Sequence, residues 1–242
     1  MILAITFYVR QPIWGVAIVG KIPEAPLPIT KALFKSKYYD TLRPIIFREA
    51  AKTWEAAKWN LDFFTDQYGD TVVSVQLDET LTGEVEGPVK TTYISTTLKK
   101  YIQHIKEHGI KAGYLNQWNI LSIHPELHTF LQIPAFYESK MLTITNLWLG
   151  PKGTKSKLHY DSDHNLFTQI YGRKLVTLIS PDQSKKCYPI NRTWYDGYSP
   201  IDILNPDLEK YPLFADVVML QAVLEPGDCS TSLKAGGMMF VR

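Results

Sequence analysis

The sequence predicts an α+β protein that is mainly β, in which a helical N-terminal half packs against a C-terminal jelly roll. From residue 142 onward, strand-like apolar runs alternate with Gly, Pro, Asp and Ser turns, as in a β sandwich or barrel. Before that point, helical segments with cap residues are more frequent. With 242 residues and 45% hydrophobic content, the chain is long enough for one sizeable core and too short to need two domains.

The chain begins with an apolar stretch, residues 1–21. Such a stretch raises the question of a signal peptide or a membrane anchor. The tripeptide Arg10-Gln11-Pro12 interrupts it well short of the ~20 apolar residues that a membrane span needs. We therefore expect residues 1–20 to be an irregular or strand-forming extension.

Helices and strands are both expected between residues 30 and 108. Helices are expected at 30–39, 60–69 and 97–108, the second beginning at its cap Asn60 and the third ending at Gly109. Strands are expected at 44–50, 71–77 and 91–96.

The C-terminal half is expected to consist of strands. These are predicted at 142–150, 157–161, 165–172, 174–180 and 217–225. The turn Pro226-Gly227-Asp228 comes next and leads into the end of the chain. Because Ser, Thr, Lys and two glycines follow this turn, we expect no further strand there.

Charge and cysteine content narrow the class of protein. The net charge of +2 gives no electrostatic argument for binding to nucleic acid or to a membrane surface, so small-molecule and protein partners stay open. The two cysteines, Cys187 and Cys229, have no CxxC spacing and predict free thiols in a reducing compartment. The expected location is the nucleus or the cytoplasm.

The segment from Leu158 to Pro181 carries the most informative chemistry. Residues two apart on a strand point to the same face, so His159 and Asp161 are expected to project together. A mononuclear iron(II) oxygenase uses two imidazoles and one carboxylate on one face of the metal, and this pair supplies two of these ligands. An isolated pair of this kind also occurs by chance, so its neighbours decide its meaning.

Two neighbours favour a metal site. Asn165 follows Asp161 by four residues, and Lys174 begins the next expected strand, where a hairpin would bring its ammonium group back toward the metal. A dicarboxylate co-substrate needs a buried cation for its distal carboxylate, which a lysine supplies. The competing interpretation is that Lys174 is solvated at a turn, as is expected for Arg173.

The remaining histidines are interpreted structurally. His104 and His108 are one helical turn apart and could hold zinc, but the Lys and Glu between them favour a solvated helix face. His124 and His128 are expected at the surface. On a continuing strand, His164 would face away from Asp161.

The stretch from Asn146 to Pro181 resembles the metal-binding core of the JmjC-domain oxygenases, which use iron(II) and 2-oxoglutarate within a double-stranded β-helix (jelly roll). The closest likeness is to the small JmjC-only members described as lysine demethylases or protein hydroxylases. The resemblance runs from about Pro44 to Asp228 and includes residues 113–127 and 205–214. It implies one JmjC/cupin-like domain over residues 21–242, with residues 1–20 outside it.

The resemblance also implies roles for individual residues. His159 and Asp161 would bind Fe(II), and Lys174 would pair with the distal carboxylate of 2-oxoglutarate. Further contacts to the co-substrate would come from Tyr114, Ser156 and Asn165.

The third metal ligand of the family is missing, because all six histidines lie at or before residue 164. In the family, the second histidine follows a turn like that at 225–228, in a strand resembling Leu-Tyr-Ile-Pro-Lys-Gly-Trp-Trp-His. Codons can be chosen for residues 230–242 that encode that strand when they are read with one extra base before the Ser230 codon. We therefore expect residues 230–242 to be an aberrant, frameshifted reading, and the barrel to be incomplete at its C-terminus with an exposed edge.

By resemblance, the chain is an Fe(II)/2-oxoglutarate-dependent dioxygenase that hydroxylates a protein side chain or demethylates N-methyl-lysine in a histone or another protein. Two alternatives stay open. A non-catalytic cupin-like binding module would fit the missing third ligand. A hydroxylase of a modified tRNA base is the other, although the near-neutral charge argues against it.

Overall fold

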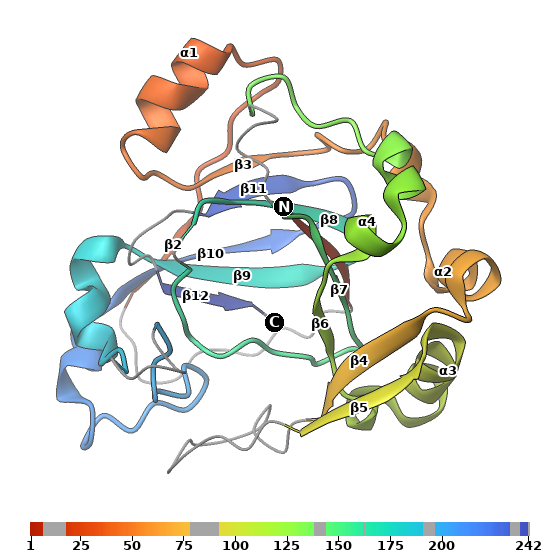
Figure 1. The fold of residues 1–242 in the computed structure, drawn as a ribbon. Coiled ribbons are helices and arrows are strands. Elements are labelled where there is room, and N and C mark those ends of the chain that lie inside the picture. Colours follow the sequence, from red (N-terminus) through yellow and green to blue (C-terminus); the bar gives the residue numbers. More distant parts are fainter. Residues whose placement is uncertain are drawn as a thin grey trace.

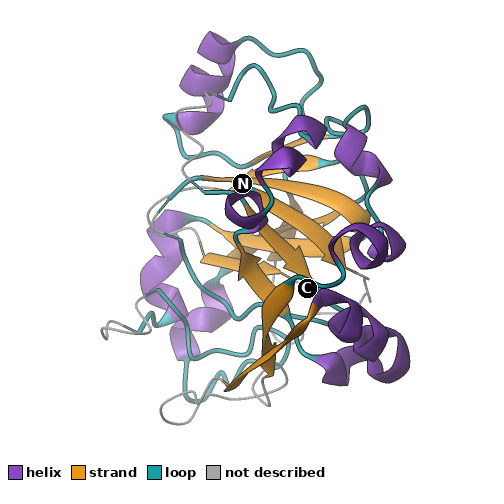
Figure 2. Cartoon of the chain, turned by 45° about the vertical axis from the view of Figure 1, so that its right-hand side comes forward, coloured by secondary structure: helices purple, strands orange, loops and turns teal. Residues whose placement is uncertain are grey.

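A computed structural model describes residues 1–6, 18–77, 92–137, 144–161, 163–190, 197–232 and 238–241. Strands occupy the centre of the molecule and helices lie around the outside (Figures 1 and 2). The described strands are β1 (Ile2–Thr6), β2 (Ile18–Lys21), β3 (Ile45–Phe47), β4 (Val72–Leu77), β5 (Thr92–Thr97), β6 (Leu115–Trp118), β7 (Asn146–Leu149), β8 (Asn165–Gly172), β9 (Lys174–Ile179), β10 (Val218–Leu224), β11 (Cys229–Ser232) and β12 (Met238–Val241).

Most of the described helices are short, and α3 (Leu98–His108) is the longest of them. The described α-helices are α1 (Lys31–Phe34), α2 (Leu61–Tyr68), α3 (Leu98–His108) and α4 (Ile120–Ile123). A π-helical turn η1 (Lys35–Tyr39) continues α1, and 3-10 helices form at η2 (Glu55–Lys58), η4 (Gly109–Ala112), η5 (Pro125–Phe130), η7 (Pro181–Cys187) and η8 (Pro212–Asp216). The helices expected at 30–39, 60–69 and 97–108 are therefore confirmed. In α2, the Asn60 side chain accepts a hydrogen bond from the Phe63 amide at 2.8 Å, as expected for a cap residue.

The larger sheet has the strand order β3-β11-β8-β1-β7-β6. The N-terminal strand β1 lies between β7 and β8 and pairs with both in parallel. The first residues of the chain are thus strand-forming, which was one of the two forms expected for them. The backbone N–H of Asn146 extends this pairing by donating to the Met1 carbonyl at 3.0 Å.

The second sheet has the order β12-β9-β10-β2. The expectation that β8 and β9 form a hairpin is wrong: only Arg173 separates them, but β8 pairs with β1 and β11, whereas β9 pairs with β10 and β12. The chain crosses from one sheet to the other at this point, so Lys174 begins a strand of the second sheet. Among the described strands both sheets are open, because each strand order has two free ends.

Two further expectations are wrong in detail. Residues 157–161 do not form a strand; His159 makes one isolated bridge with Tyr198, and Tyr160 donates its amide hydrogen to the Gly197 carbonyl at 2.8 Å. A strand does follow Asp228, since β11 pairs antiparallel with both β3 and β8. The two neighbouring strands supply backbone partners whatever side chains β11 carries, which explains why the composition of this segment was misleading.

Helices α2 and α3 lie beside a third sheet on one side of the molecule (Figure 1). The pair β4-β5 forms a small antiparallel sheet, and α3 packs beside it and against α2 (Figure 1). The buried side of α3 consists of Leu98, Tyr101, Ile102 and Ile105. The Tyr101 hydroxyl lies 2.9 Å from the Leu149 carbonyl and accepts the Leu115 amide hydrogen at 3.1 Å, so it ties α3 to β6 and β7.

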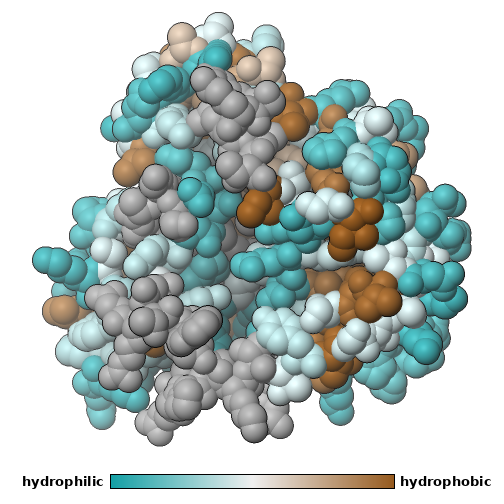
Figure 3. Space-filling model, viewed as in Figure 1, coloured by the Kyte–Doolittle hydropathy of each residue, from teal (hydrophilic) through white to brown (hydrophobic). Residues whose placement is uncertain are grey.

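Three further features concern the exposed apolar residues, the two cysteines and the length of the helices. Figure 3 shows hydrophobic residues on the part of this face where α4, β4 and β5 lie in Figure 1, and Val72 and Ile123 are among the exposed apolar side chains. Cys187 and Cys229 are both free, as the sequence predicted, and both are buried. Among the described residues, no helix is long and apolar enough to cross a membrane.

Candidate metal and co-substrate site

His159 and Asp161 converge even though they do not lie on a regular strand. The His159 Nε2 atom is 3.7 Å from Asp161 Oδ1. The other ring nitrogen, Nδ1, lies 2.7 Å from the Lys157 carbonyl oxygen, which can only accept a hydrogen bond. This contact places the proton on Nδ1 and leaves the Nε2 lone pair directed away from the backbone, which is the arrangement of a metal-binding imidazole.

The Asp161 carboxylate is oriented in the same way. Its Oδ2 atom accepts a hydrogen bond from the Asn165 side-chain amide at 2.6 Å. The remaining oxygen, Oδ1, is the one nearest His159 Nε2. Two ligand atoms bound side by side on an octahedral metal lie about 3 Å apart, so a small inward rotation of either side chain would let both reach one ion.

Lys174 is a buried cation at the start of β9. Its side chain is 2% exposed, and its Nζ atom donates a hydrogen bond to the Tyr114 hydroxyl at 2.9 Å. The rings of Phe167, Tyr114 and Trp148 surround the ammonium group with centroids 5.3, 5.5 and 5.9 Å away. No acidic side chain of the described residues forms an ion pair with it. The competing interpretation, a lysine solvated at a turn, is therefore wrong, whereas Arg173 is exposed as predicted.

Burial has a direct electrostatic consequence here. It lowers the pKa of Lys174 to about 7, because the ammonium form loses its hydration without gaining a counter-charge. Burial also raises the pKa of Tyr114 above its ordinary range, so this phenol stays protonated and neutral. An anionic ligand beside Lys174 would supply the missing counter-charge.

Strand β8 connects the two parts of the site. Asn165 and Phe167 are two residues apart on β8 and therefore point to the same face of the sheet. Asn165 holds Asp161, and Phe167 contacts the ammonium group of Lys174. The His159–Asp161 pair and the Lys174–Tyr114 pair thus approach one face of β8 from its two neighbouring segments.

Sequence reasoning missed the aromatic wall of this site. Trp148 on β7 lies 5.5 Å from Tyr114, measured between ring centroids, and its buried indole N–H finds no acceptor among the described residues. The available signal was the expected strand at 142–150, in which Trp148 alternates with the buried Leu147 and Leu149. A tryptophan on a half-buried strand is usually a core residue, so the sequence pattern alone does not show whether its ring lines a ligand site or only packs in the core.

The other predicted residues lie as follows. Ser156 is half-buried on the segment between β7 and β8. His164 precedes β8 and stacks on Tyr39 with centroids 4.1 Å apart. His128 is exposed as expected, but His124 is partly buried, with its Nε2 atom 2.9 Å from Thr71 Oγ1.

The described residues bring no third metal ligand to His159 and Asp161. In these parts of the chain, the one group of three side chains able to hold an ion is His104, Glu107 and His108, which belongs to α3. The residues present therefore fit two of the three protein ligands of an iron site. They also fit a carboxylate ligand. Among the described residues, the Lys174 ammonium group has no acidic partner and the Trp148 indole N–H has no acceptor.

Comparison with known proteins agrees with this arrangement. The profile of the cupin-like domain family matches residues 31–229. Lysine-specific demethylase 8 of Danio rerio is 32% identical over 203 residues, covering 81% of this chain and 49% of that protein. Jumonji C domain-containing protein 5 of Drosophila melanogaster is 26% identical over 231 residues, covering 90% of this chain and 56% of that protein.

A third relative carries a different name. The tRNA wybutosine-synthesizing protein 5 of Danio rerio is 24% identical over 220 residues, covering 83% of this chain and 65% of that protein. The chain spans about half the length of the first two relatives. The family match extends over most of the sequence and includes every residue of the candidate site. The chain therefore belongs to the cupin-like domain family and is similar to its JmjC-domain members.

Proposed function

We propose that the chain is an Fe(II)/2-oxoglutarate-dependent oxygenase whose two sheets are the halves of a JmjC-type double-stranded β-helix. The observation that carries this proposal is the buried ammonium group of Lys174, which lacks an acidic partner among the described residues. A buried cation without a counter-ion is costly unless a ligand neutralises it. The distal carboxylate of 2-oxoglutarate would do so, with the Tyr114 hydroxyl as a neighbouring hydrogen-bonding group.

Each residue of the site has a defined task in this proposal. His159 Nε2 and Asp161 Oδ1 hold the iron, while Lys157 and Asn165 fix the orientation of these ligands. Ser156 and Asn165 are further candidate contacts to 2-oxoglutarate. The bound iron, with 2-oxoglutarate and dioxygen, supplies an oxidant that inserts oxygen into a C–H bond and leaves succinate and carbon dioxide.

The names of the relatives support a proposed substrate class. Two of them are named as a lysine-specific demethylase and a JmjC domain-containing protein, so a protein or peptide substrate, with histones as candidates, is the natural proposal. Oxygen insertion at an N-methyl group would end in demethylation, and insertion at another side-chain carbon would leave an alcohol. We propose a nuclear or cytoplasmic location. The proposal does not include direct binding to nucleic acid or to a membrane.

We further propose that residues 230–242 are read out of frame and that the native reading supplies the third ligand. The family match ends at Cys229, immediately before this segment. Ser230 and Thr231 are 2% and 3% exposed on β11, and the Thr231 hydroxyl has no hydrogen-bond partner among the described residues. Small polar side chains at these positions are unusual, because β11 lies between Ile45–Phe47 and β8. The shifted reading places Leu and Tyr there.

The test of this reading is the nucleotide sequence of the native transcript from the Glu225 codon onward. One extra nucleotide before the Ser230 codon would restore the strand ending in Trp-Trp-His. A transcript that encodes Ser230 to Arg242 as written would overturn the frameshift, and the chain would then have two of the three ligands.

Two alternatives rest on their own observations. A cupin-like binding module without turnover is favoured by the absence of a third ligand beside His159 and Asp161 in the described residues. It predicts that 2-oxoglutarate binds without release of succinate, both in the chain as written and in the chain with the shifted reading of residues 230–242. A tRNA-base hydroxylase is suggested by the third relative and predicts RNA binding that weakens steeply with salt.

A further inference from the structure

Helix α3 presents three metal-binding side chains on its exposed side. Its buried side packs against the small sheet and α2, while His104, Glu107 and His108 are all exposed. Residues three and four positions apart on an α-helix are neighbours on its surface. The solvated helix face that the sequence predicted is thus present, and it carries a chelating pattern.

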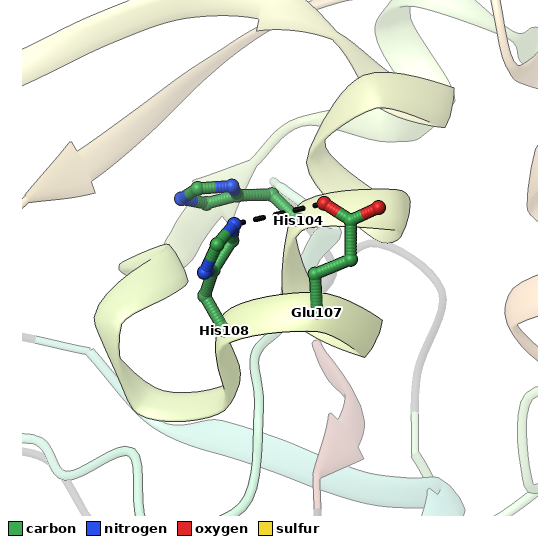
Figure 4. A group of neighbouring side chains, drawn as sticks. All are labelled: His104, Glu107 and His108. Carbon is green, nitrogen blue, oxygen red and sulfur yellow. Dashed lines mark ion pairs between the residues drawn. The ribbon is translucent and has the colours of Figure 1, made fainter.

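The geometry of these side chains is close to that of a metal site. The imidazole rings of His104 and His108 have centroids 4.2 Å apart, and one ligand atom from each of the three residues lies within 4.8 Å of the others (Figure 4). The distance from His108 Nε2 to Glu107 Oε2 is 3.6 Å. In a tetrahedral zinc site the ligand atoms are about 3.4 Å apart, so the glutamate and one imidazole already have this spacing.

Neighbouring side chains favour this arrangement. Gln103 donates a hydrogen bond to Glu107 Oε1, which leaves Oε2 on the side of His108. The nearby ammonium group of Lys106 is directed to Asp62, 3.1 Å away, rather than to the cluster. A cation bound here would therefore meet a carboxylate and two imidazoles, and the ammonium group of Lys106 would not repel it.

We propose that His104, Glu107 and His108 form a peripheral site for a divalent transition metal, with zinc as the best fit. Two imidazoles and one carboxylate are ligands that suit zinc, and a water molecule would complete the tetrahedron. Both histidines belong to the last turns of α3, so the bound ion would clamp the end of this helix. This site is separate from the His159–Asp161 pair and does not depend on the proposed oxygenase activity.

The decisive experiment separates this site from the candidate iron site. The whole chain carrying His159→Ala and Asp161→Ala is titrated with Zn²⁺ by calorimetry, and in parallel with Co²⁺, whose visible absorption reports tetrahedral coordination. We expect one equivalent of Zn²⁺ to bind. Adding His104→Ala or His108→Ala should weaken this binding at least about tenfold, and adding Glu107→Gln should weaken it and change the Co²⁺ spectrum.

A matched control is His128→Ala, which removes another exposed histidine and should leave Zn²⁺ binding unchanged. All altered residues on α3 are exposed, so circular dichroism should show an unaltered fold. Binding that survives both His104→Ala and His108→Ala would overturn the proposal, as would the absence of Zn²⁺ binding to the chain lacking His159 and Asp161. An effect of His128→Ala equal to that of His104→Ala would also contradict it.

Discussion

The buried ammonium group of Lys174 makes a quantitative prediction about stability and pH. Its pKa is about 7 in the folded chain, against an ordinary value of 10.5 for an unfolded chain. Below pH 7 both states carry the proton, so the full cost of burying the charge is present. Between about pH 7 and 10.5 the unfolded state binds a proton that the folded state lacks, and stability therefore rises with pH.

The perturbation is Lys174→Met, which nearly preserves side-chain length and removes the charge. Relative to this variant, the unfolding free energy of the unaltered chain should rise by about 2 kcal/mol between pH 7 and pH 9. Urea unfolding followed by circular dichroism at several pH values measures this difference. Lys152→Met, at an exposed position, is the matched control and should show no such slope.

Adding 2-oxoglutarate extends the same experiment. A carboxylate bound beside Lys174 would restore its charge, so the co-substrate should stabilise the unaltered chain near pH 7 and leave Lys174→Met unchanged. A difference between the two chains that does not vary with pH would refute the account of Lys174 as an unpaired buried cation. Equal stabilisation of both chains by 2-oxoglutarate would refute its role as the carboxylate partner.

Three other changes have defined outcomes. Asn165→Ala should weaken Co²⁺ binding at the His159–Asp161 pair by about tenfold, because Asp161 loses the group that orients it. The control Asn205→Ala, at an exposed position, should have no effect in the same titration. Asp228→Ala should lower the unfolding free energy, measured by urea unfolding, by about 3 kcal/mol. The carboxylate is 3% exposed and accepts hydrogen bonds from Arg48 Nη1 at 2.6 Å and from the Glu49 and Glu225 amides. An effect below about 1 kcal/mol would contradict this reasoning. Tyr101→Phe should cost about 1–3 kcal/mol in the same assay, because the buried Leu115 amide loses its acceptor, and retention of full stability would show that the hydroxyl is dispensable.

Local signals explain what the sequence predicted correctly. The helix at 60–69 could be predicted because it begins at the cap residue Asn60 and ends at Gly69. The helix at 97–108 could be predicted because Gly109 ends it. The candidate site could be proposed because a His-x-Asp pair, an Asn and a Lys occur within a short stretch that resembles a known metal-binding core, and its role stays a prediction. The 3.7 Å approach of His159 to Asp161 was expected, although it arises from an irregular segment bridged to Tyr198 and not from a strand.

Long-range pairing explains what the sequence did not predict. The crossing between sheets at Arg173 depends on which strands flank β8 and β9, and no local pattern contains that information. The insertion of β1 between β7 and β8 is likewise a contact between distant parts of the chain. The burial of Lys174 agrees with the interpretation that the sequence favoured, a buried cation, although the hairpin expected to place it does not form.

The central claim is that this site activates iron and 2-oxoglutarate, and the most direct measurement is the release of succinate from 2-oxoglutarate. The assay compares the chain as written with a chain re-encoded with one extra base before the Ser230 codon, each with added iron(II). We expect the re-encoded chain, in which the Trp-Trp-His strand completes the site, to release succinate, and we expect His159→Ala to abolish this release. A folded re-encoded chain that binds 2-oxoglutarate but releases no succinate would contradict the oxygenase assignment and would leave a binding module in its place.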